Sequence, residues 1–226
     1  KNVLVNLIDG SASGVVFLYR YGDVFFCGCT PELLVRKEGN VIESECLAGT
    51  CPQSDDPAES QRLAADLLQD DKNRREHAFV TDFIRSVVER NCYDVDIPNE
   101  PRIKSLKHVQ HLQTPVSARL MDGRSVQNLV GQLTPTPALS GSPVGEAMML
   151  LRTIEPFNRG FFGSSVGFVD ADGNGSFSVG IRSGVFDGEV GYVFAGCGIV
   201  EGSDAEAEYN EIDMKLKTIL SAFDGG

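Results

Sequence analysis

Acidic side chains occupy helix faces that the hydrophobic pattern assigns to the protein interior. In a helix expected from about Asn73 to Arg90, Glu76 shares one face with the apolar residues Val80, Phe83 and Val87. A carboxylate on such a face needs a partner, because an unpaired charge inside a protein is very costly. An ion pair within the helix is one interpretation, and a Mg²⁺ ion held by a few carboxylates and waters is the other.

A second charged group lies in the last expected helix. Glu208, Glu211 and Lys215 fall beside the apolar residues Ile212 and Ile219. Glu211 and Lys215 are four residues apart, so they can pair along the helix surface. Two acidic helix faces in one chain nevertheless keep a shared Mg²⁺ site open as the alternative.

Two further features could bind an anion. The glycine-rich loop 196–203 leads into the last helix, so its backbone N–H groups could contact a carboxylate, although a tight turn is the simpler interpretation. Arg182 is expected in a strand from Ser178 to Phe186, where Gly180 and Gly184 leave space around its guanidinium. It could clamp a carboxylate or lie on a solvated sheet face.

The elements that position these residues change along the chain. Short β-branched and aromatic runs predict strands at Val3–Ile8, Val15–Tyr19, Val24–Cys27, Leu33–Arg36 and Val41–Cys46, and strand-like patterns return over Arg102–Leu120 and Phe162–Val200. Helices are predicted at Ala58–Gln69, Asn73–Arg90, Val126–Leu133, from Ser142-Pro143 to about Glu155, and through Leu220 after a capping box at Ser203–Glu206. A rigid loop is expected over residues 134–143. With no repeat or linker, residues 1–226 predict one α+β domain.

Composition excludes several classes of function. The net charge is −12 and the sequence pI is about 4.7, which argues against broad binding to nucleic acid or an anionic membrane. No apolar run is long enough to span a bilayer, and no secretion signal opens the chain, so a cytoplasmic protein is expected. The six cysteines contain no CxxC pair, and the three histidines are too scattered for a metal site built from histidine.

Taken together, these features resemble the chorismate-binding domain of chorismate-utilising enzymes, with isochorismate synthase as the member whose pattern fits. The matching stretches occur in family order across nearly the whole chain: Lys1-Asn-Val-Leu-Val, Thr30-Pro-Glu-Leu-Leu, Leu47-Ala-Gly-Thr50, Arg75-Glu-His77, His111-Leu, Pro135-Thr-Pro-Ala-Leu-Ser-Gly141, Glu155-Pro-Phe-Asn-Arg159, Gly180-Ile-Arg-Ser183, Ala195-Gly-Cys-Gly-Ile-Val200 and Glu208-Tyr-Asn-Glu-Ile-Asp-Met-Lys215.

The resemblance implies two antiparallel sheets packed against each other with helices outside, as in anthranilate synthase component I, with the first strands of that fold missing. Residues 1–226 would then be the chorismate-binding catalytic domain and the C-terminal part of a longer chain. The implied substrate is chorismate and the implied cofactor is Mg²⁺. No glutaminase subunit, nucleic acid or membrane partner is expected.

The resemblance also implies roles for individual residues. Lys1 would be the general base that activates water, and Glu32 the general acid that protonates the departing hydroxyl. Glu76 and Glu211 would be Mg²⁺ ligands, with Glu208 in the same site. The expected contacts to substrate carboxylates are Arg182, Lys215 and the backbone at Gly196 and Gly198, and the expected lining is Gly49, Thr50, Ala138, Leu139 and Phe162.

The implied reaction is the isomerisation of chorismate to isochorismate, in which water adds at C2 while the C4 hydroxyl leaves. Its product would be consistent with menaquinone or siderophore biosynthesis. A lysine base requires a lowered pKa and a glutamic acid donor a raised one.

Three positions separate the members of the family. By resemblance, Lys1 stands where anthranilate synthase has Gln, Ala48 where aminodeoxychorismate synthase has a nucleophilic Lys, and Ala138 where salicylate synthase tends to have Thr. All three positions fit isochorismate synthase. A salicylate synthase, another chorismate-utilising enzyme and a truncated, non-catalytic chorismate-binding module remain alternatives.

Overall fold

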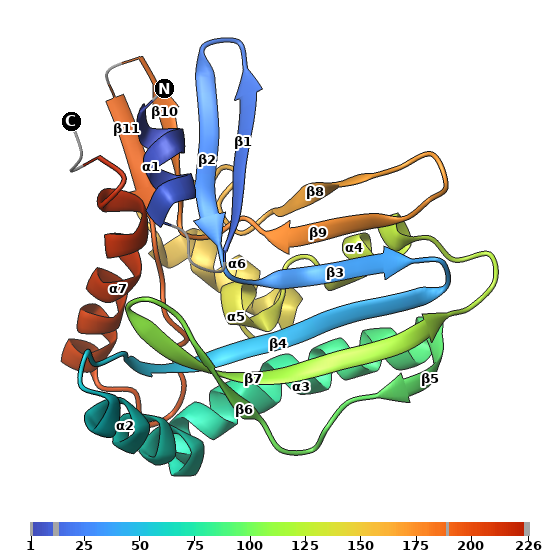
Figure 1. The fold of residues 1–226 in the computed structure, drawn as a ribbon, viewed down its shortest axis with the longest axis horizontal. Coiled ribbons are helices and arrows are strands. Elements are labelled where there is room, and N and C mark those ends of the chain that lie inside the picture. Colours follow the sequence, from blue (N-terminus) through green and yellow to red (C-terminus); the bar gives the residue numbers. More distant parts are fainter. Residues whose placement is uncertain (1, 11–13, 189, 224–226) are drawn as a thin grey trace.

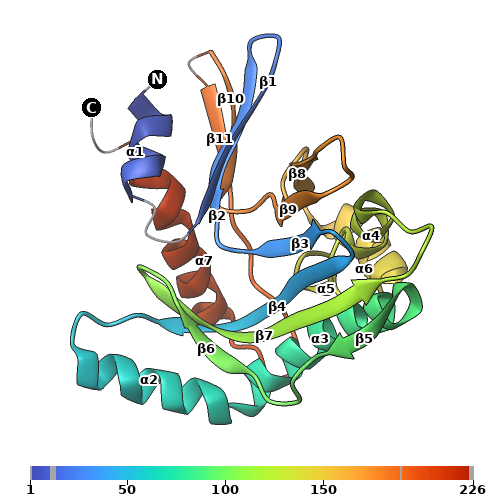
Figure 2. The same ribbon diagram turned by 45° about the vertical axis from the view of Figure 1, so that its right-hand side comes forward.

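Antiparallel strands form two sheets that meet at an angle (Figures 1 and 2). The structure, a computed structural model, describes residues 2–10, 14–188 and 190–223. The smaller sheet has the strand order β1–β2–β10–β11; the larger has the order β5–β7–β4–β3–β9–β8, with β6 paired to β7. The strands are β1 (Val15–Tyr21), β2 (Val24–Thr30), β3 (Leu33–Glu38), β4 (Val41–Pro52), β5 (Cys92–Asp96), β6 (Arg102–Ser105), β7 (Val109–Leu120), β8 (Ser165–Val169), β9 (Gly175–Val179), β10 (Ser183–Asp187) and β11 (Val190–Phe194).

Helices cover the outer faces of the sheets. The longest, α3, runs along the larger sheet, and α7 lies beside the smaller sheet (Figure 1). The helices are α1 (Asn2–Gly10), α2 (Pro57–Gln69), α3 (Asp71–Asn91), α4 (Val126–Leu133), α5 (Pro137–Ser140), α6 (Val144–Ile154) and α7 (Ala205–Leu220). Side-chain caps fix several starts: Asp56 accepts a hydrogen bond from the Ala58 amide, and Asp70 accepts one from Asn73.

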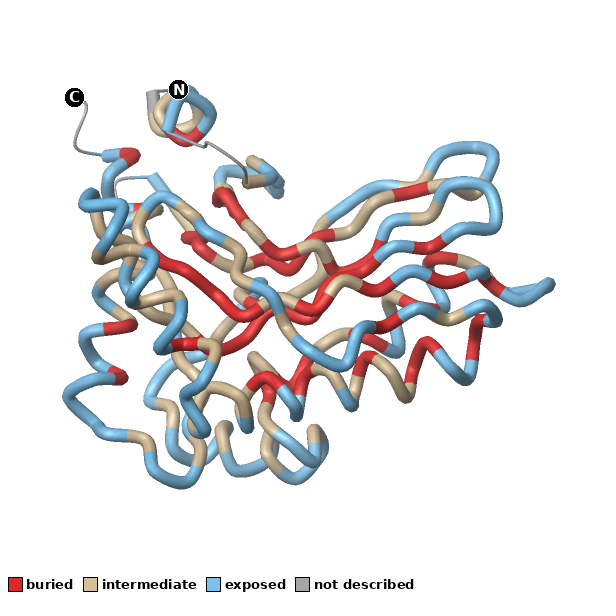
Figure 3. Tube along the Cα trace, turned by 60° about the horizontal axis from the view of Figure 1, so that its bottom comes forward, coloured by how far each residue is buried: buried red, intermediate tan, exposed pale blue. Residues whose placement is uncertain are grey.

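The main core lies between α3 and the larger sheet. The apolar stripe of α3 packs there, so Val80, Val87 and Val88 are almost fully buried. Ile42 of β4 and Leu129 of α4 belong to the same cluster. Burial therefore follows one face of α3 and the middle of the sheets (Figure 3). This packing fixes the side of α3 that carries Glu76.

The chain passes from one sheet to the other at two places that lie side by side. It goes from β2 to β3 through Pro31 and Glu32, and from β9 to β10 through residues 180–182. Hydrogen bonds join the two crossings: the Cys29 amide donates to the Arg182 carbonyl at 3.2 Å, and the Val179 amide donates to the Glu32 carbonyl at 3.1 Å. Two residues far apart in sequence are thus held together where the sheets meet.

The α+β class and the two antiparallel sheets are confirmed, and the predicted helix Val126–Leu133 has the observed bounds. The strand predicted at Val3–Ile8 is wrong, because these residues belong to helix α1. Leu7 belongs to the buried cluster that contains Ile219, and Val3, four residues before it, packs against this cluster. Helical spacing therefore overrides the β-branched composition of this run.

Other boundaries also differ from the prediction. Arg182 is not inside a strand, because β9 ends at Val179 and β10 begins at Ser183. The last helix is capped by Asp204, whose side chain accepts from the Ala207 amide, rather than by a box at Ser203–Glu206. Strand β5 was not predicted. The strand-like region Arg102–Leu120 divides into two strands, β6 and β7. The loop expected over residues 134–143 contains the short helix α5.

Candidate active site

A cavity of about 610 Å³ lies where the two sheets meet. Eleven of the predicted site residues line it: Glu32, Gly49, Thr50, Glu76, Ala138, Leu139, Phe162, Arg182, Gly196, Gly198 and Lys215. Glu211 of α7 is joined to this group by an ion pair with Lys215. Lys1 lies outside the described residues.

A neighbouring cavity of about 690 Å³ lies on the other side of Pro31 and Arg182, lined by residues of α1 and α7. Of the predicted site residues that the structure describes, Arg182 alone contributes to its lining. The chemistry-bearing side chains therefore gather in the first cavity.

Glu32 lies on the first crossing between the sheets and is only 5% exposed. Burial raises the pKa of its carboxyl to about 8, and the negative charge of Glu45 adds to this effect. Arg182, Lys104 and Lys215 act in the opposite direction without cancelling it. Glu32 is therefore mostly protonated at neutral pH and can donate a proton into the cavity.

Arg182 lies on the second crossing and is buried, which removes the solvated sheet face as an interpretation. Its backbone has φ of +50°, a left-handed conformation that costs a non-glycine residue about 1 kcal/mol. The hydrogen bond from the Cys29 amide to the Arg182 carbonyl holds it there. Burial lowers the pKa of the guanidinium to about 10, so it remains charged at neutral pH.

His111 links Arg182 to Thr50. A guanidinium nitrogen of Arg182 lies 3.4 Å from His111 Nε2, and His111 Nδ1 lies 3.0 Å from Thr50 Oγ1. Because a guanidinium can only donate, Nε2 accepts and Nδ1 carries the proton. Burial, with the neighbouring Arg182 charge, holds the pKa of His111 well below its ordinary value. A neutral imidazole therefore orients the cation without repelling it.

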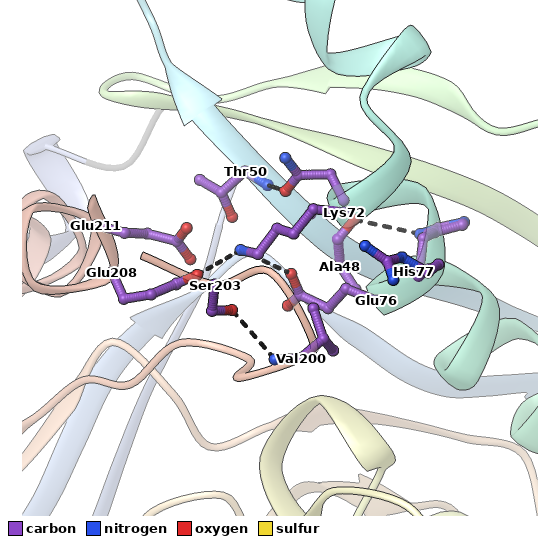
Figure 4. A network of polar contacts seen from close by, with 12 residues as sticks. Ala48, Thr50, Lys72, Glu76, His77, Val200, Ser203, Glu208 and Glu211 are labelled. Atoms are coloured by element: carbon purple, nitrogen blue, oxygen red, sulfur yellow. Dashed lines mark hydrogen bonds and ion pairs between the residues drawn. The ribbon is translucent and has the colours of Figure 1, made fainter. Parts of the chain in front are cut away.

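Carboxylates from α3 and α7 face one another at the edge of the cavity (Figure 4). Lys72 lies between them, with its Nζ 2.6 Å from Glu208 Oε1 and 3.8 Å from Glu76 Oε2. Lys215 pairs with Glu211 within α7 and also donates to the Gly196 carbonyl at 3.0 Å. The ion pairs expected within each helix are thus present, and Lys72 adds a link between the two helices.

The charges in this cluster shift each other's protonation. Burial, reinforced by Glu211, raises the pKa of Glu76 to about 7. Burial alone would raise the pKa of Glu208, but its hydrogen bond with Lys72 lowers it below the ordinary value. The cluster therefore holds an excess of negative charge that two lysines only partly neutralise.

The donor chemistry of this cluster fits Mg²⁺, although no formed site is present. Within the described part of the chain, no three His, Cys, Asp or Glu side chains lie close enough to hold a metal ion. The predicted ligands Glu76, Glu208 and Glu211 nevertheless supply the carboxylate oxygens that Mg²⁺ prefers. Glu208 Oε2 is buried and has no hydrogen-bond partner among the described residues. The metal site remains a prediction.

Gly198, in the loop 196–203, leaves space for the Glu76 carboxylate. A Cβ atom on Gly198 would lie 2.3 Å from Glu76 Oε1, so the carboxylate rests directly against the backbone there. The tight turn expected in this loop is at Gly202, which has φ of +88°. The loop therefore positions Glu76 as well as lining the cavity.

His77, the residue after Glu76, fixes α3 against the larger sheet. Its Nδ1 lies 3.3 Å from the Ala48 carbonyl and its Nε2 lies 2.8 Å from Thr114 Oγ1. Burial lowers the pKa of His77 to about 4, so the ring is neutral. These contacts set the position of Glu76 relative to the cavity wall.

Two polar residues of the site were not predicted. Lys72 precedes Glu76 by four residues, and this spacing on one helix face could have indicated it. His111 occurs in one of the matching stretches but was given no role, because its partners come from β4 and from the crossing at Arg182.

Comparison with known proteins gives the family. The sequence model of the chorismate-binding enzymes matches residues 1–224. The chain belongs to this family. Isochorismate synthase MenF of Bacillus subtilis is 39% identical over 223 residues, which are 99% of this chain and 47% of the relative. Anthranilate synthase component 1 of Saccharolobus solfataricus is 32% identical over 222 residues, 97% of this chain and 53% of the relative.

A solved structure agrees with the fold of this chorismate-binding enzyme. The menaquinone-specific isochorismate synthase MenF of Escherichia coli superimposes with a TM-score of 0.88 at 30% identity, over 98% of this chain and 51% of that one. The chain spans about half the length of the relatives it matches. Within the described residues, no helix is both long and apolar enough to cross a membrane.

Proposed function

We propose that this chorismate-binding enzyme converts chorismate to isochorismate in a Mg²⁺-dependent reaction. The observation that carries the proposal is the pairing of functions in one cavity: a buried carboxyl with a pKa of about 8, and two cations that can hold an anionic substrate. The isochorismate synthases among its relatives support the same reaction.

In this proposal, the two carboxylates of chorismate bind at the positive end of the cavity. One N–H group of the Arg182 guanidinium donates to neutral His111, and its remaining N–H groups can donate to a carboxylate. Lys215 lies between Glu211 and the Gly196 carbonyl and supplies the second positive charge. Apolar Ala138, Leu139 and Phe162 line the wall and exclude water from the ring.

Two residues then move protons in opposite directions. Lys1 takes a proton from the water that attacks C2, and Glu32 gives a proton to the C4 hydroxyl, which leaves as water. One water enters and one leaves, so the product is an isomer of the substrate. Glu32 can act in this sense because it is protonated at neutral pH before the reaction begins.

Glu76 and Glu211 would hold the metal, with Glu208 beside them. When bound, Mg²⁺ would neutralise the ring carboxylate and draw electron density from the ring. Lys72 and Lys215 partly neutralise these carboxylates in the structure described here. The Gly198 backbone holds the Glu76 carboxylate at the cavity wall.

The choice within the family rests on three residues. Ala48 lines the cavity and offers only a methyl group, so it cannot form the covalent adduct made by the lysine of aminodeoxychorismate synthases. Lys1 suits water activation better than the Gln of anthranilate synthases. Ala138 leaves room for the enolpyruvyl group and makes no hydrogen bond to it through its side chain.

Product analysis tests the proposal. The purified chain is incubated with chorismate and Mg²⁺, with and without ammonia, and the products are separated and identified. We expect isochorismate and little pyruvate. Anthranilate formed with ammonia, or no turnover by folded protein, would overturn the proposal.

Salicylate synthase is the second candidate, because by resemblance it tends to have Thr where Ala138 lines the cavity, which adds a hydroxyl and a methyl group to the wall. The variant Ala138→Thr should gain some pyruvate release if the hydroxyl holds the enolpyruvyl group in a reactive pose. Stoichiometric pyruvate from the unmutated chain would assign it to this second class.

A further inference from the structure

A buried ion pair lies in the larger sheet behind Glu32. Lys104 of β6 places its Nζ 2.7 Å from Glu45 Oε1 and 2.9 Å from Oε2. The side chains are 21% and 8% exposed, respectively. A buried ion pair adds little to the free energy of unfolding, because the cost of removing both charges from water offsets their attraction. Its place next to Glu32 suggests a more specific role.

The pair bonds the backbone on both sides of Glu32. Lys104 Nζ donates to the Pro31 carbonyl at 2.7 Å, and the Leu33 amide donates to Glu45 Oε1 at 2.9 Å. The residue before Glu32 and the residue after it are therefore tied to one ion pair. The side-chain amide of Gln113 donates to the other oxygen of Glu45 and fixes the carboxylate from the third side.

The same pair contributes to the charge around Glu32. Glu45 is the negative group that, after burial, raises the pKa of Glu32; Lys104 lowers it. The other charged groups that face Glu32 are Arg182 on the second crossing and Lys215 of α7, and both lower it. Neither Glu45 nor Lys104 is among the described residues that line the substrate cavity.

We propose that Glu45 and Lys104 are positioning residues for the general acid: they hold the peptide groups that flank Glu32 and keep its carboxyl directed into the cavity. The proposal rests on the proposed function of Glu32. Neither residue contacts the substrate in this account. Both residues act on Glu32 indirectly, through the peptide groups that flank it and through their own charges.

Two variants of similar shape separate this role from general stability. Glu45→Gln removes a negative charge near Glu32, and Lys104→Met removes a positive one. The alkaline limb of the kcat–pH profile should move down by about 1 pH unit in Glu45→Gln and move up in Lys104→Met. KM for chorismate should change less than about threefold in both, since the cavity lining is intact. Glu43→Gln, on the same strand in an exposed ion pair with Arg36, is the matched control and should leave the limb unchanged.

Carbon-13 NMR titration of labelled Glu32 gives a second readout that needs no turnover. Opposite shifts of its pKa in the two variants support the proposal even if the wild-type product is not isochorismate, so failure of the proposed function is seen separately. Shifts in the same direction, or a Glu45→Gln titration like that of Glu43→Gln, overturn it. If Glu45→Gln does not fold, the direction of the shift in Lys104→Met decides alone.

Discussion

Lys72 of α3 reaches across to Glu208 of α7, with its ammonium nitrogen 2.6 Å from the carboxylate oxygen. The same nitrogen lies 3.8 Å from Glu76, so one cation lies between two of the predicted Mg²⁺ ligands. Lys215 forms an ion pair with the third predicted ligand, Glu211, within α7. The site is thus a cluster of three carboxylates whose negative charge two lysines partly neutralise.

The first prediction is that this cluster binds Mg²⁺. Glu76→Gln and Glu211→Gln each remove one carboxylate while keeping the size of the side chain. Mg²⁺ affinity measured by calorimetry should fall at least about tenfold in each variant, and turnover should be lost in EDTA.

Glu206→Gln is the control for this experiment, because Glu206 lies in the same helix and is exposed. It should bind Mg²⁺ like the unmutated chain. Full activity in EDTA, or unchanged affinity in both test variants, would contradict the assignment of the metal site.

The second prediction concerns the contact between Gly198 and Glu76. In Gly198→Ala the new Cβ would overlap the Glu76 carboxylate, which we expect to move aside. Since the displaced group is the end of a flexible side chain, the fold should persist, with a melting temperature close to that of the unmutated chain. Mg²⁺ affinity should fall by roughly 10- to 100-fold. Unchanged affinity would show that Glu76 is not a ligand.

The third prediction is that Glu32→Gln separates catalysis from binding. The amide cannot donate the proton that the departing hydroxyl needs, so kcat should fall by roughly 10²- to 10⁴-fold. Chorismate binding measured by calorimetry should persist, because Arg182 and Lys215 carry the carboxylate contacts. Glu38→Gln, at the exposed end of β3, is the control. A wild-type kcat in Glu32→Gln would mean that another group is the acid.

The fourth prediction follows from the raised pKa of Glu32. The carboxyl loses its proton near its ordinary value of 4.5 in the unfolded chain and at about 8 in the folded protein. Between these values the unfolded state is favoured as pH rises, so Glu32 lowers the free energy of unfolding over that range. Glu32→Gln removes this effect. It should therefore stabilise the protein at pH 8.5 relative to pH 5 by about 2 kcal/mol or more, measured by denaturant titration at both pH values. An equal effect at both pH values would contradict the raised pKa.

Part of this site could be predicted from helix periodicity. The face shared by Glu76, Val80 and Val87 placed a carboxylate against the core, and the packing of α3 confirms that face. The burial of Glu208 and Glu211 follows from the same argument applied to α7. These residues repeat with the helix period, so local sequence contains the information.

Glu32 and Arg182 could not be placed in this way. Each lies on a short crossing between two sheets, where neither helix nor strand periodicity applies. Their proximity depends on the pairing of β2 with β10 and of β3 with β9, whose partners are about 150 residues apart in sequence. Only the resemblance to a known family indicated Glu32. The same limit explains why Glu45 and Lys104 were not predicted, since they meet across β4, β7 and β6.

The most direct test of the central claim is chorismate turnover by the purified chain in water enriched in oxygen-18, with Mg²⁺ present. The account predicts isochorismate that carries one solvent oxygen, located in the C2 hydroxyl, because water attacks C2 while the C4 hydroxyl departs. Unlabelled isochorismate would contradict water addition. Salicylate with stoichiometric pyruvate would contradict the assigned product.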